Sequence, residues 1–344
     1  MWAYIGRRLL IFPVTLLGLS ILVFSLSAFL TPAERLMAYI HSPLQVRGPE
    51  VVAQLIEKHG LNDPLYMQYG RWLTGVLNGD FGFSTTAQEP VSQAIARRLP
   101  ATIELVLLSI FPIIFGGIAL GVISAAYHNK PLDHGMRLVA ITGWSMPTFL
   151  LALLIMMLFY GELRWFLPQR LSYWAKDVVL SADFVRYTGM NVLDGVLNGR
   201  WDIVGDAFRH LMMPTLSLVL VDWAALCRIT RSSMLESLHQ DYVRTARAKG
   251  QIERLVVFRH ALRNALLPAV TFGGMLVAWL LAGVVITETI FNYEGVGSFA
   301  AAAAQQLDFA GILGFAMFFG TLMISMNLIV DIAYAFLDPR VRLD

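Results

Sequence analysis

The 344-residue sequence has little of what soluble enzymes and disulfide-stabilised domains use. Charged residues make up only 15% of it, and cysteine occurs once, at Cys227. A single cysteine excludes an internal disulfide and any multi-cysteine metal site. None of the four lysines follows a glycine, so the Gly-Lys pair of a phosphate-binding loop is absent. We therefore do not expect this chain to hydrolyse nucleotides.

Other signatures of catalysis are missing as well. The seven histidines include no His-Glu-x-x-His pair, and no set of acids, bases and nucleophiles suggests a reaction centre. We predict no catalytic residue and no metal site. The net charge of +2 gives no reason to expect binding to nucleic acid.

Apolar residues dominate instead. At 57%, their share is too high for a water-soluble domain of this length. Since a helix needs roughly 20 apolar residues to cross a bilayer, the sequence predicts an all-α integral membrane protein with six transmembrane helices. The first apolar run is too long for a cleavable signal peptide, whose apolar part has roughly 7 to 15 residues. The predicted spans are 9–30, 101–127, 138–160, 211–227, 267–288 and 309–333.

The orientation follows from the basic residues in short loops, which favour the cytoplasmic side. Arg7 and Arg8 precede the first span, Lys130 and Arg137 lie between the second and third, and eight Lys or Arg occur in 228–266. Arg340 and Arg342 follow the last span. We predict that segments 1–8, 228–266 and 334–344 are cytoplasmic, and that loops 31–100 and 161–210 are extracytoplasmic and helical.

One amphipathic helix is predicted in the first extracytoplasmic loop. Apolar residues recur at helical spacing over 64–77, after Pro64 and before Asn78-Gly79. The string GVLNG at 75–79 recurs at 195–199. We attribute the repeat to a common way of ending helices and not to duplication.

The basic segment 228–266 predicts a helical protrusion. Residues 235–249 lack glycine and proline and predict a helix that ends at Gly250, and a second helix is expected over 252–266. On that second helix one face is expected to pack against the spans, namely Leu255, Phe258, Leu262 and Leu266.

Two partners are open for this protrusion. Basic helices at a membrane surface bind anionic lipid headgroups. The small residues Ala246, Ala248 and Gly250 at the turn favour insertion into a protein groove instead.

Polar residues inside spans are candidates for function because a charge in lipid costs about 2.5 to 3.5 kcal/mol. Asp222, Asn327 and Asp331 are such residues, and Glu104 and Glu288 lie near outer ends. One interpretation is that the acids pair with nearby arginines, such as Arg228, and anchor the helix ends. The other is that Asp222 faces a water-filled pathway and favours cationic cargo.

The protrusion resembles the "EAA" coupling loop of the permease subunits in the dipeptide, oligopeptide and nickel branch of ABC importers. The resemblance rests on DYVRTARAKG (241–250) and RHALRNALLP (259–268), and it extends over nearly the whole chain. The further blocks are YIGRRLL (4–10), DPLYMQYGRWL (63–73), GDFGFS (79–84), RLPATIEL (98–105), RSSMLE (231–236) and NLIVDIAYAFLDPRVR (327–342).

The resemblance implies a type I ABC importer permease fold in a prokaryotic inner membrane. It implies that a second, homologous permease completes the pathway, that two cytosolic ATPases bind the ATP and Mg²⁺, and that an extracytoplasmic solute-binding protein delivers cargo. No cofactor is expected on this chain. The coupling surface carries over onto Arg244, Thr245, Ala246, Ala248, Lys249, Gly250, Gln251, Glu253 and Arg254.

The sequence departs from the family pattern at the coupling loop. Arg244, Thr245 and Ala246 stand where the general pattern has Glu-Ala-Ala, and Gln251-Ile252 stand where this branch more often has Leu-Ser.

Peptides or peptide-like solutes are the expected cargo, with oligosaccharides, opines, glutathione and nickel chelates as alternatives. A self-sufficient secondary carrier or channel is the competing class. A membrane-embedded hydrolase would need paired catalytic groups, which the sequence does not offer.

Overall fold

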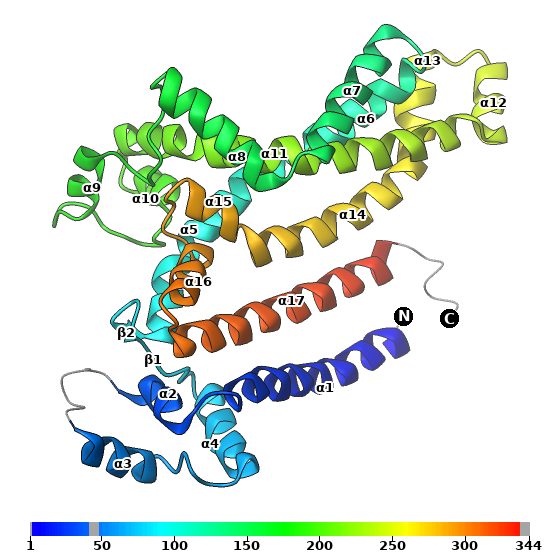
Figure 1. Ribbon diagram of the computed structural model, residues 1–344. Helices are drawn as coiled ribbons and strands as arrows, with labels where there is room; N and C mark the ends of the chain where they lie inside the picture. The colour runs from blue at the N-terminus through cyan, green and yellow to red at the C-terminus, as the bar shows by residue number, and fades with distance from the viewer. Residues whose placement is uncertain (1, 41–47, 338–344) are drawn as a thin grey trace.

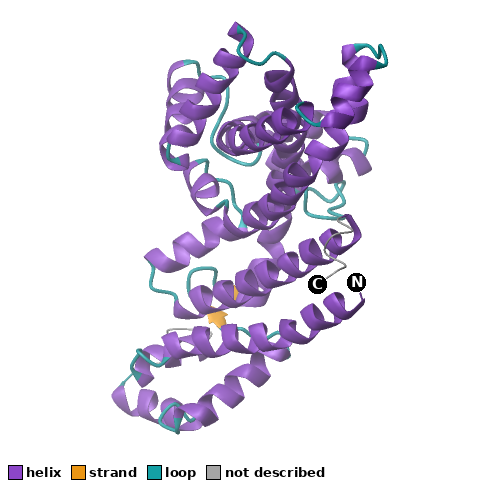
Figure 2. Cartoon of the chain, turned by 90° about the vertical axis from the view of Figure 1, so that its right-hand side faces the viewer, coloured by secondary structure: helices purple, strands orange, loops and turns teal. Residues whose placement is uncertain are grey.

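The structure is a computed structural model that describes residues 2–40 and 48–337 (Figure 1). Residue 1, part of the first extracytoplasmic loop and residues 338–344 of the predicted C-terminal segment lie outside these ranges. The described chain is almost entirely helical (Figure 2). Within it, the two-residue strands β1 (Phe83–Ser84) and β2 (Glu89–Pro90) form the one antiparallel hairpin. The predicted all-helical membrane class is confirmed.

The first and last long helices lie side by side. Helix α1 (Trp2–Ser27) and helix α17 (Phe309–Leu337) run along one flank of the molecule, with the N-terminal end of α1 near the C-terminal end of α17 (Figure 1). Gly320 allows a close contact with Leu19, whose side chain would meet a Cβ at that position at 2.6 Å. Arg8 and Asp331 join the two helices through an ion pair of 2.9 Å.

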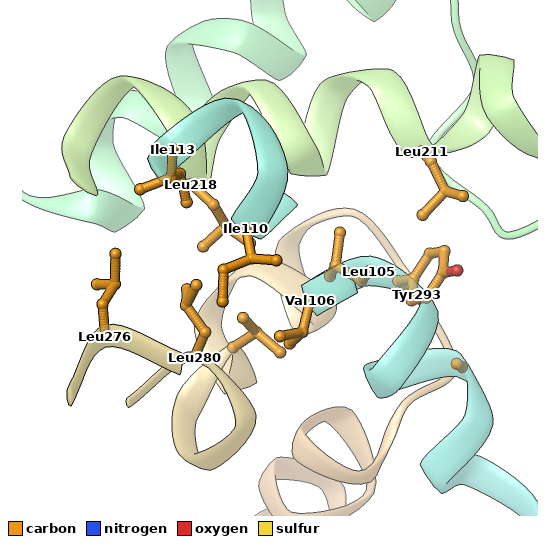
Figure 3. Close-up of a cluster of buried hydrophobic side chains, with 11 residues drawn as sticks. Leu105, Val106, Ile110, Ile113, Leu211, Leu218, Leu276, Leu280 and Tyr293 are labelled. Atoms are coloured by element: carbon orange, nitrogen blue, oxygen red, sulfur yellow. The ribbon is translucent and has the colours of Figure 1, made fainter. Parts of the chain in front are cut away.

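The centre of the molecule is built around one long helix, α11 (Trp201–Leu238). Its 38 residues extend for about 57 Å at 1.5 Å per residue, nearly twice the hydrocarbon thickness of a bilayer. Helix α11 packs against α14 (Leu262–Gly283) and against α5 (Val91–Phe111), which continues through the π-helical turn η3 (Pro112–Gly116) into α6 (Gly117–Ala126). Leucines 105, 211, 218, 276 and 280 fill the space between these helices (Figure 3).

Two glycines bring α6 and α11 into close contact. A Cβ on Gly117 would lie 2.9 Å from Cβ of Leu226, and one on Gly121 would lie 2.7 Å from the carbonyl oxygen of Cys227. The Gly-x-x-x-Gly pair therefore serves packing within the chain, because only glycine permits this approach.

The third predicted span is broken. Helices α7 (Pro131–Ser145) and α8 (Thr148–Met156), the latter extended by the π-helical turn η4 (Met157–Glu162), meet at an angle of 103°. Pro147 disfavours helical geometry at the preceding residue, and Met146 is extended with ψ 130°. Within residues 2–40 and 48–337, five helices are long and apolar enough to cross a membrane, and the bent pair makes six if it forms one span.

Short helices cover the end of the molecule that carries the β-hairpin, which we call the outer end (Figure 1). They comprise α2 (Pro32–Leu36), η1 (Met37–Tyr39), α3 (Pro49–Lys58), α4 (Leu65–Leu77), α9 (Tyr173–Val179), α10 (Asn191–Leu197), α15 (Val285–Ile290) and α16 (Val296–Gln305). Helix α4 begins after Pro64 and ends before Asn78-Gly79, as predicted. Both GVLNG strings end a helix, with left-handed glycines at Gly79 (φ +80°) and Gly199 (φ +67°).

The segment that follows α11 differs from the prediction. Helix α11 continues to Leu238, so the expected helix over 235–249 is wrong as a single element. The backbone N–H groups of His239 and Gln240 bond to Glu236 and Ser237, and Gln240 is extended with ψ 152°. A separate short helix, α12 (Asp241–Ala248), then crosses to α13 (Glu253–Leu255) and η5 (Val256–Ala261), which lead directly into α14.

Candidate functional site

Helix α12 projects at the end of the molecule opposite the β-hairpin (Figure 1). Asp241 lies in its first turn, where the partial positive charge of the helix N-terminus stabilises a carboxylate. Gly250 follows its last turn with φ +74°, a conformation that glycine adopts without steric cost. Arg247 and Glu253 close the turn across Gly250 with an ion pair of 2.7 Å, and this hydrogen bond raises the pKa of the Arg247 guanidinium.

A hydrophobic cluster fixes α12 to the membrane helices. Val243 and Ala246 of α12 are buried in it, together with Met234 and Leu238 of α11. The remaining buried members come from α6, η5 and α14, namely Val122, Ala125, Val256, Val257, Ala261 and Ala265. Because non-polar side chains from five elements pack here, a force on α12 reaches several helices at once.

The predicted coupling residues fall into three environments. Ala246 was expected at the free tip, but it is only 5% exposed and belongs to the packed side of α12. Gln251 is half-buried and its Oε1 lies 2.6 Å from Nε2 of His260. The others lie on the exposed surface: Arg244, Thr245, Ala248, Lys249, Gly250, Glu253 and Arg254.

The apolar face predicted for the second helix is corrected by the structure. Phe258 is 56% exposed and Leu255 is 37% exposed, whereas Val256 and Val257 are buried. The π-helical turn η5 has a wider repeat than an α-helix, so the spacing of 3.6 residues used for the prediction does not hold there. Leu255 and Phe258 instead line an open groove of about 440 Å³ with Ile252, Arg254 and Arg259.

The polar residues of the spans have different surroundings. Asp331 pairs with Arg8, and Asn327 lies on the exposed side of α17. The Arg228 guanidinium, which was one candidate partner for Asp222, lies over the Trp144 ring at 5.2 Å. Among the described residues, the half-buried Asp222 carboxylate has no hydrogen bond or ion pair.

Asp222 lies deep in the helix packing and not at a helix end. Helical spacing places it on the same side of α11 as Leu218, one turn away, and Thr215, two turns away. Leu218 packs in the central cluster shown in Figure 3. The Thr215 hydroxyl is buried and has no hydrogen-bond partner within the described part of the chain. This face of α11 therefore carries two polar groups that the chain itself leaves unpaired.

A buried polar network that sequence reasoning missed lies at the outer end. The Glu104 carboxylate accepts hydrogen bonds from Arg170 (2.8 Å), Tyr293 (3.0 Å) and the Val192 backbone (2.7 Å). Neighbouring Thr102 donates to Glu288 at 2.6 Å. Glu288 also accepts a hydrogen bond from the Ser298 backbone N–H at 2.9 Å. These contacts hold the outer loops on α5.

No cluster of three or more His, Cys, Asp or Glu capable of holding a metal ion is found in residues 2–40 and 48–337. The structure thus combines apolar spanning helices, a helical cover at one end and the short helix α12 at the other. Together these define a polytopic membrane protein.

Comparison with known proteins identifies the family. Residues 117–343 match the "Binding-protein-dependent transport system inner membrane component", and residues 1–106 match the N-terminal part of such membrane components. The chain belongs to this family of inner-membrane permeases, and the resemblance seen in the sequence is confirmed.

Named relatives cover nearly the whole chain. The dipeptide transport system permease protein of Alkalihalophilus pseudofirmus is 35% identical over 99% of this chain and 100% of its own length. The oligopeptide transport system permease protein of Bacillus subtilis is 36% identical over 99% of this chain and all of its own. The glutathione transport system permease protein of Salmonella paratyphi A is 34% identical over 98% of both chains.

Proposed function

We propose that this chain is the permease subunit of an ATP-driven importer and that its cargo is short peptides or peptide-like solutes. The observation that carries the proposal is the similarity over 99% of the chain to permeases of dipeptide and oligopeptide transport systems. Glutathione is itself a short peptide derivative, so the glutathione relative fits the same cargo class.

The proposal assigns ATP and Mg²⁺ to two cytosolic ATPase subunits. The chain has no Gly-Lys phosphate-binding loop, and α12 exposes Ala248 and Gly250 at its end. Both residues are small, so the helix end is slim enough to enter a groove of another protein. A second, homologous permease completes the pathway, and an extracytoplasmic solute-binding protein supplies the cargo.

The groove beside α13 supports protein docking over lipid binding. Ile252 is 70% exposed and Phe258 is 56% exposed, next to Arg254 and Arg259. Exposed apolar side chains flanked by arginine are typical of the buried centre of protein interfaces. We therefore extend the ATPase contact from α12 onto this groove.

The orientation of the chain is part of the proposal. Short-loop arginines and lysines favour a cytoplasmic location for both termini and for α12, while the helical cover that includes α9 and α10 faces the solute-binding protein. Within the membrane, we assign Asp222 to the pathway and Asp331 to anchoring of α17 through Arg8.

Co-purification from the native membrane tests the assembly. The tagged chain is expected to bring down a second permease and ATPase subunits, with two ATPases per permease pair. Isolation of the chain alone, in a form that still transports solute without ATP, would support a secondary carrier and overturn the proposal.

A further inference from the structure

A fully buried carboxylate, that of Asp133, lies where α6, α7 and α11 meet, and α11 leads to the coupling helix α12. Asp133, in the first turn of α7, is 0% exposed. Its two oxygens accept hydrogen bonds from Nε and Nη2 of Arg231, each at 2.8 Å. The Ser124 hydroxyl and the Asn129 backbone N–H donate the remaining two bonds. Asp133 thus collects donors from three segments of the chain.

These donors belong to two helices and to the turn that precedes α7. Ser124 is near the end of α6, Asn129 is in the turn before α7, and Arg231 is on α11. Arg231 also donates to Nδ1 of His128 at 3.1 Å. A planar guanidinium fixed on both carboxylate oxygens has one preferred orientation. The pair therefore sets the position of the start of α7 relative to α11.

The position of Arg231 relates this contact to α12. Helix α11 runs without interruption through Arg231 to Leu238, and α12 begins at Asp241. The hydrophobic cluster around Ala246 joins α12 to α6, α11, η5 and α14, but its buried members include none from α7. Asp133 supplies that missing connection at the cytoplasmic end of α7.

The broken third span makes this connection mechanically useful. At its other end, α7 contacts α11 closely, since a Cβ on Gly143 would lie 2.6 Å from the carbonyl oxygen of Leu220. The 103° bend to α8 follows directly. With both of its ends fixed to α11, α7 moves with α11 and transfers that motion to the bend at Pro147.

We propose that the Asp133–Arg231 pair is a positioning link that makes α7 and α8 move with the coupling helix. ATP hydrolysis on the partners would then displace the third span together with α11. Without the link, α12 would still dock and the ATPases would still turn over, but the third span would follow incompletely. This inference rests on the proposed function.

Variants of the link test it in the complete transporter, reconstituted with both permeases, ATPases and solute-binding protein. Arg231→Lys keeps the charge but loses the two-point contact, Asp133→Asn removes the charge, and Ser124→Ala removes one donor. Peptide uptake and ATP hydrolysis are measured separately. We expect uptake per ATP to fall about fivefold or more in Arg231→Lys and Asp133→Asn, and by less in Ser124→Ala.

Arg8→Lys is the matched control, because it alters another arginine–aspartate pair near the same end of the molecule. It should leave uptake per ATP unchanged. A proportional loss of uptake and hydrolysis in every assembled variant would show that the pair is only structural and would overturn the inference. If Asp133→Asn does not assemble, Arg231→Lys and Ser124→Ala decide. Failure of the wild-type complex to use ATP for uptake would overturn the proposed function instead.

Discussion

Asp222 is a half-buried carboxylate within α11, and the described chain offers it no cation. A charge placed in a bilayer costs about 2.5 to 3.5 kcal/mol even on mild scales, so an unpaired acid implies water or a cationic ligand. Thr215 on the same side has a buried hydroxyl that is also unpaired. The side chain of a lysine or arginine in a peptide is such a cationic ligand, and the Asp222 carboxylate and the Thr215 hydroxyl could both accept hydrogen bonds from it during passage.

Replacing Asp222 with asparagine should therefore weaken uptake selectively. Loss of one charge-assisted hydrogen bond, about 1.5 kcal/mol, predicts about a tenfold lower initial rate for lysine- or arginine-containing dipeptides. Acidic dipeptides should be affected less, because their negatively charged side chains are not attracted to the Asp222 carboxylate. Competition between labelled cationic and acidic dipeptides provides the measurement.

Asp222→Glu is the control for that substitution, since it retains the charge and should preserve the preference. Equal losses for cationic and acidic dipeptides in Asp222→Asn would contradict a pathway role.

The outer network shows what could not be predicted at the residue scale. Composition placed Glu104 and Glu288 near outer helix ends, but their partners are distant in sequence. Arg170 lies 66 residues from Glu104, and Tyr293 lies 189 residues away. No local spacing links such residues, because the contact exists only after the outer loops fold onto α5.

Helix α12 has an exposed side, which we expect to dock on the ATPase, and a buried side, which contributes to the stability of the fold. Ala248 is exposed, whereas Ala246 is buried against α11 and η5. Ala248→Trp should block ATPase binding by steric conflict and leave the thermal unfolding midpoint nearly unchanged. Ala246→Trp should destabilise the chain by about 1 to 3 kcal/mol, since it overfills a packed site. Co-purification and thermal unfolding in detergent measure the two effects.

A tryptophan at Ser181 is the control for added bulk, because this residue is exposed in the outer loops. It should affect neither ATPase binding nor unfolding. Retention of the ATPases by Ala248→Trp would place the docking surface elsewhere.

Element prediction failed where helices departed from the ideal repeat. The helix 64–77 was found because proline and Asn-Gly mark its ends. The break at His239–Gln240 has no glycine or proline to reveal it, so α11 and α12 were merged. In η5 the wider turn moved Leu255 and Phe258 to the surface and buried Val256 and Val257. A prediction that assumes 3.6 residues per turn cannot detect the extra residue of a π-helical turn.

For the whole molecule, the hydrophobicity of the sequence was sufficient to predict an all-helical membrane protein. Five long apolar helices and one bent pair are present, in agreement with the predicted membrane fold. The 103° bend at Pro147 could not be predicted in size, because the neighbouring helices determine how far the two arms separate. The family match then identifies this membrane protein as a permease.

ATP-dependent uptake into proteoliposomes distinguishes an importer permease from a self-sufficient carrier. The chain is reconstituted with its second permease and ATPases, with solute-binding protein and a labelled dipeptide on one side and ATP with Mg²⁺ on the ATPase side. We expect concentrative dipeptide uptake that requires ATP, both permeases and the solute-binding protein. Dipeptide uptake by this chain alone, driven by an ion gradient and indifferent to ATP, would contradict it.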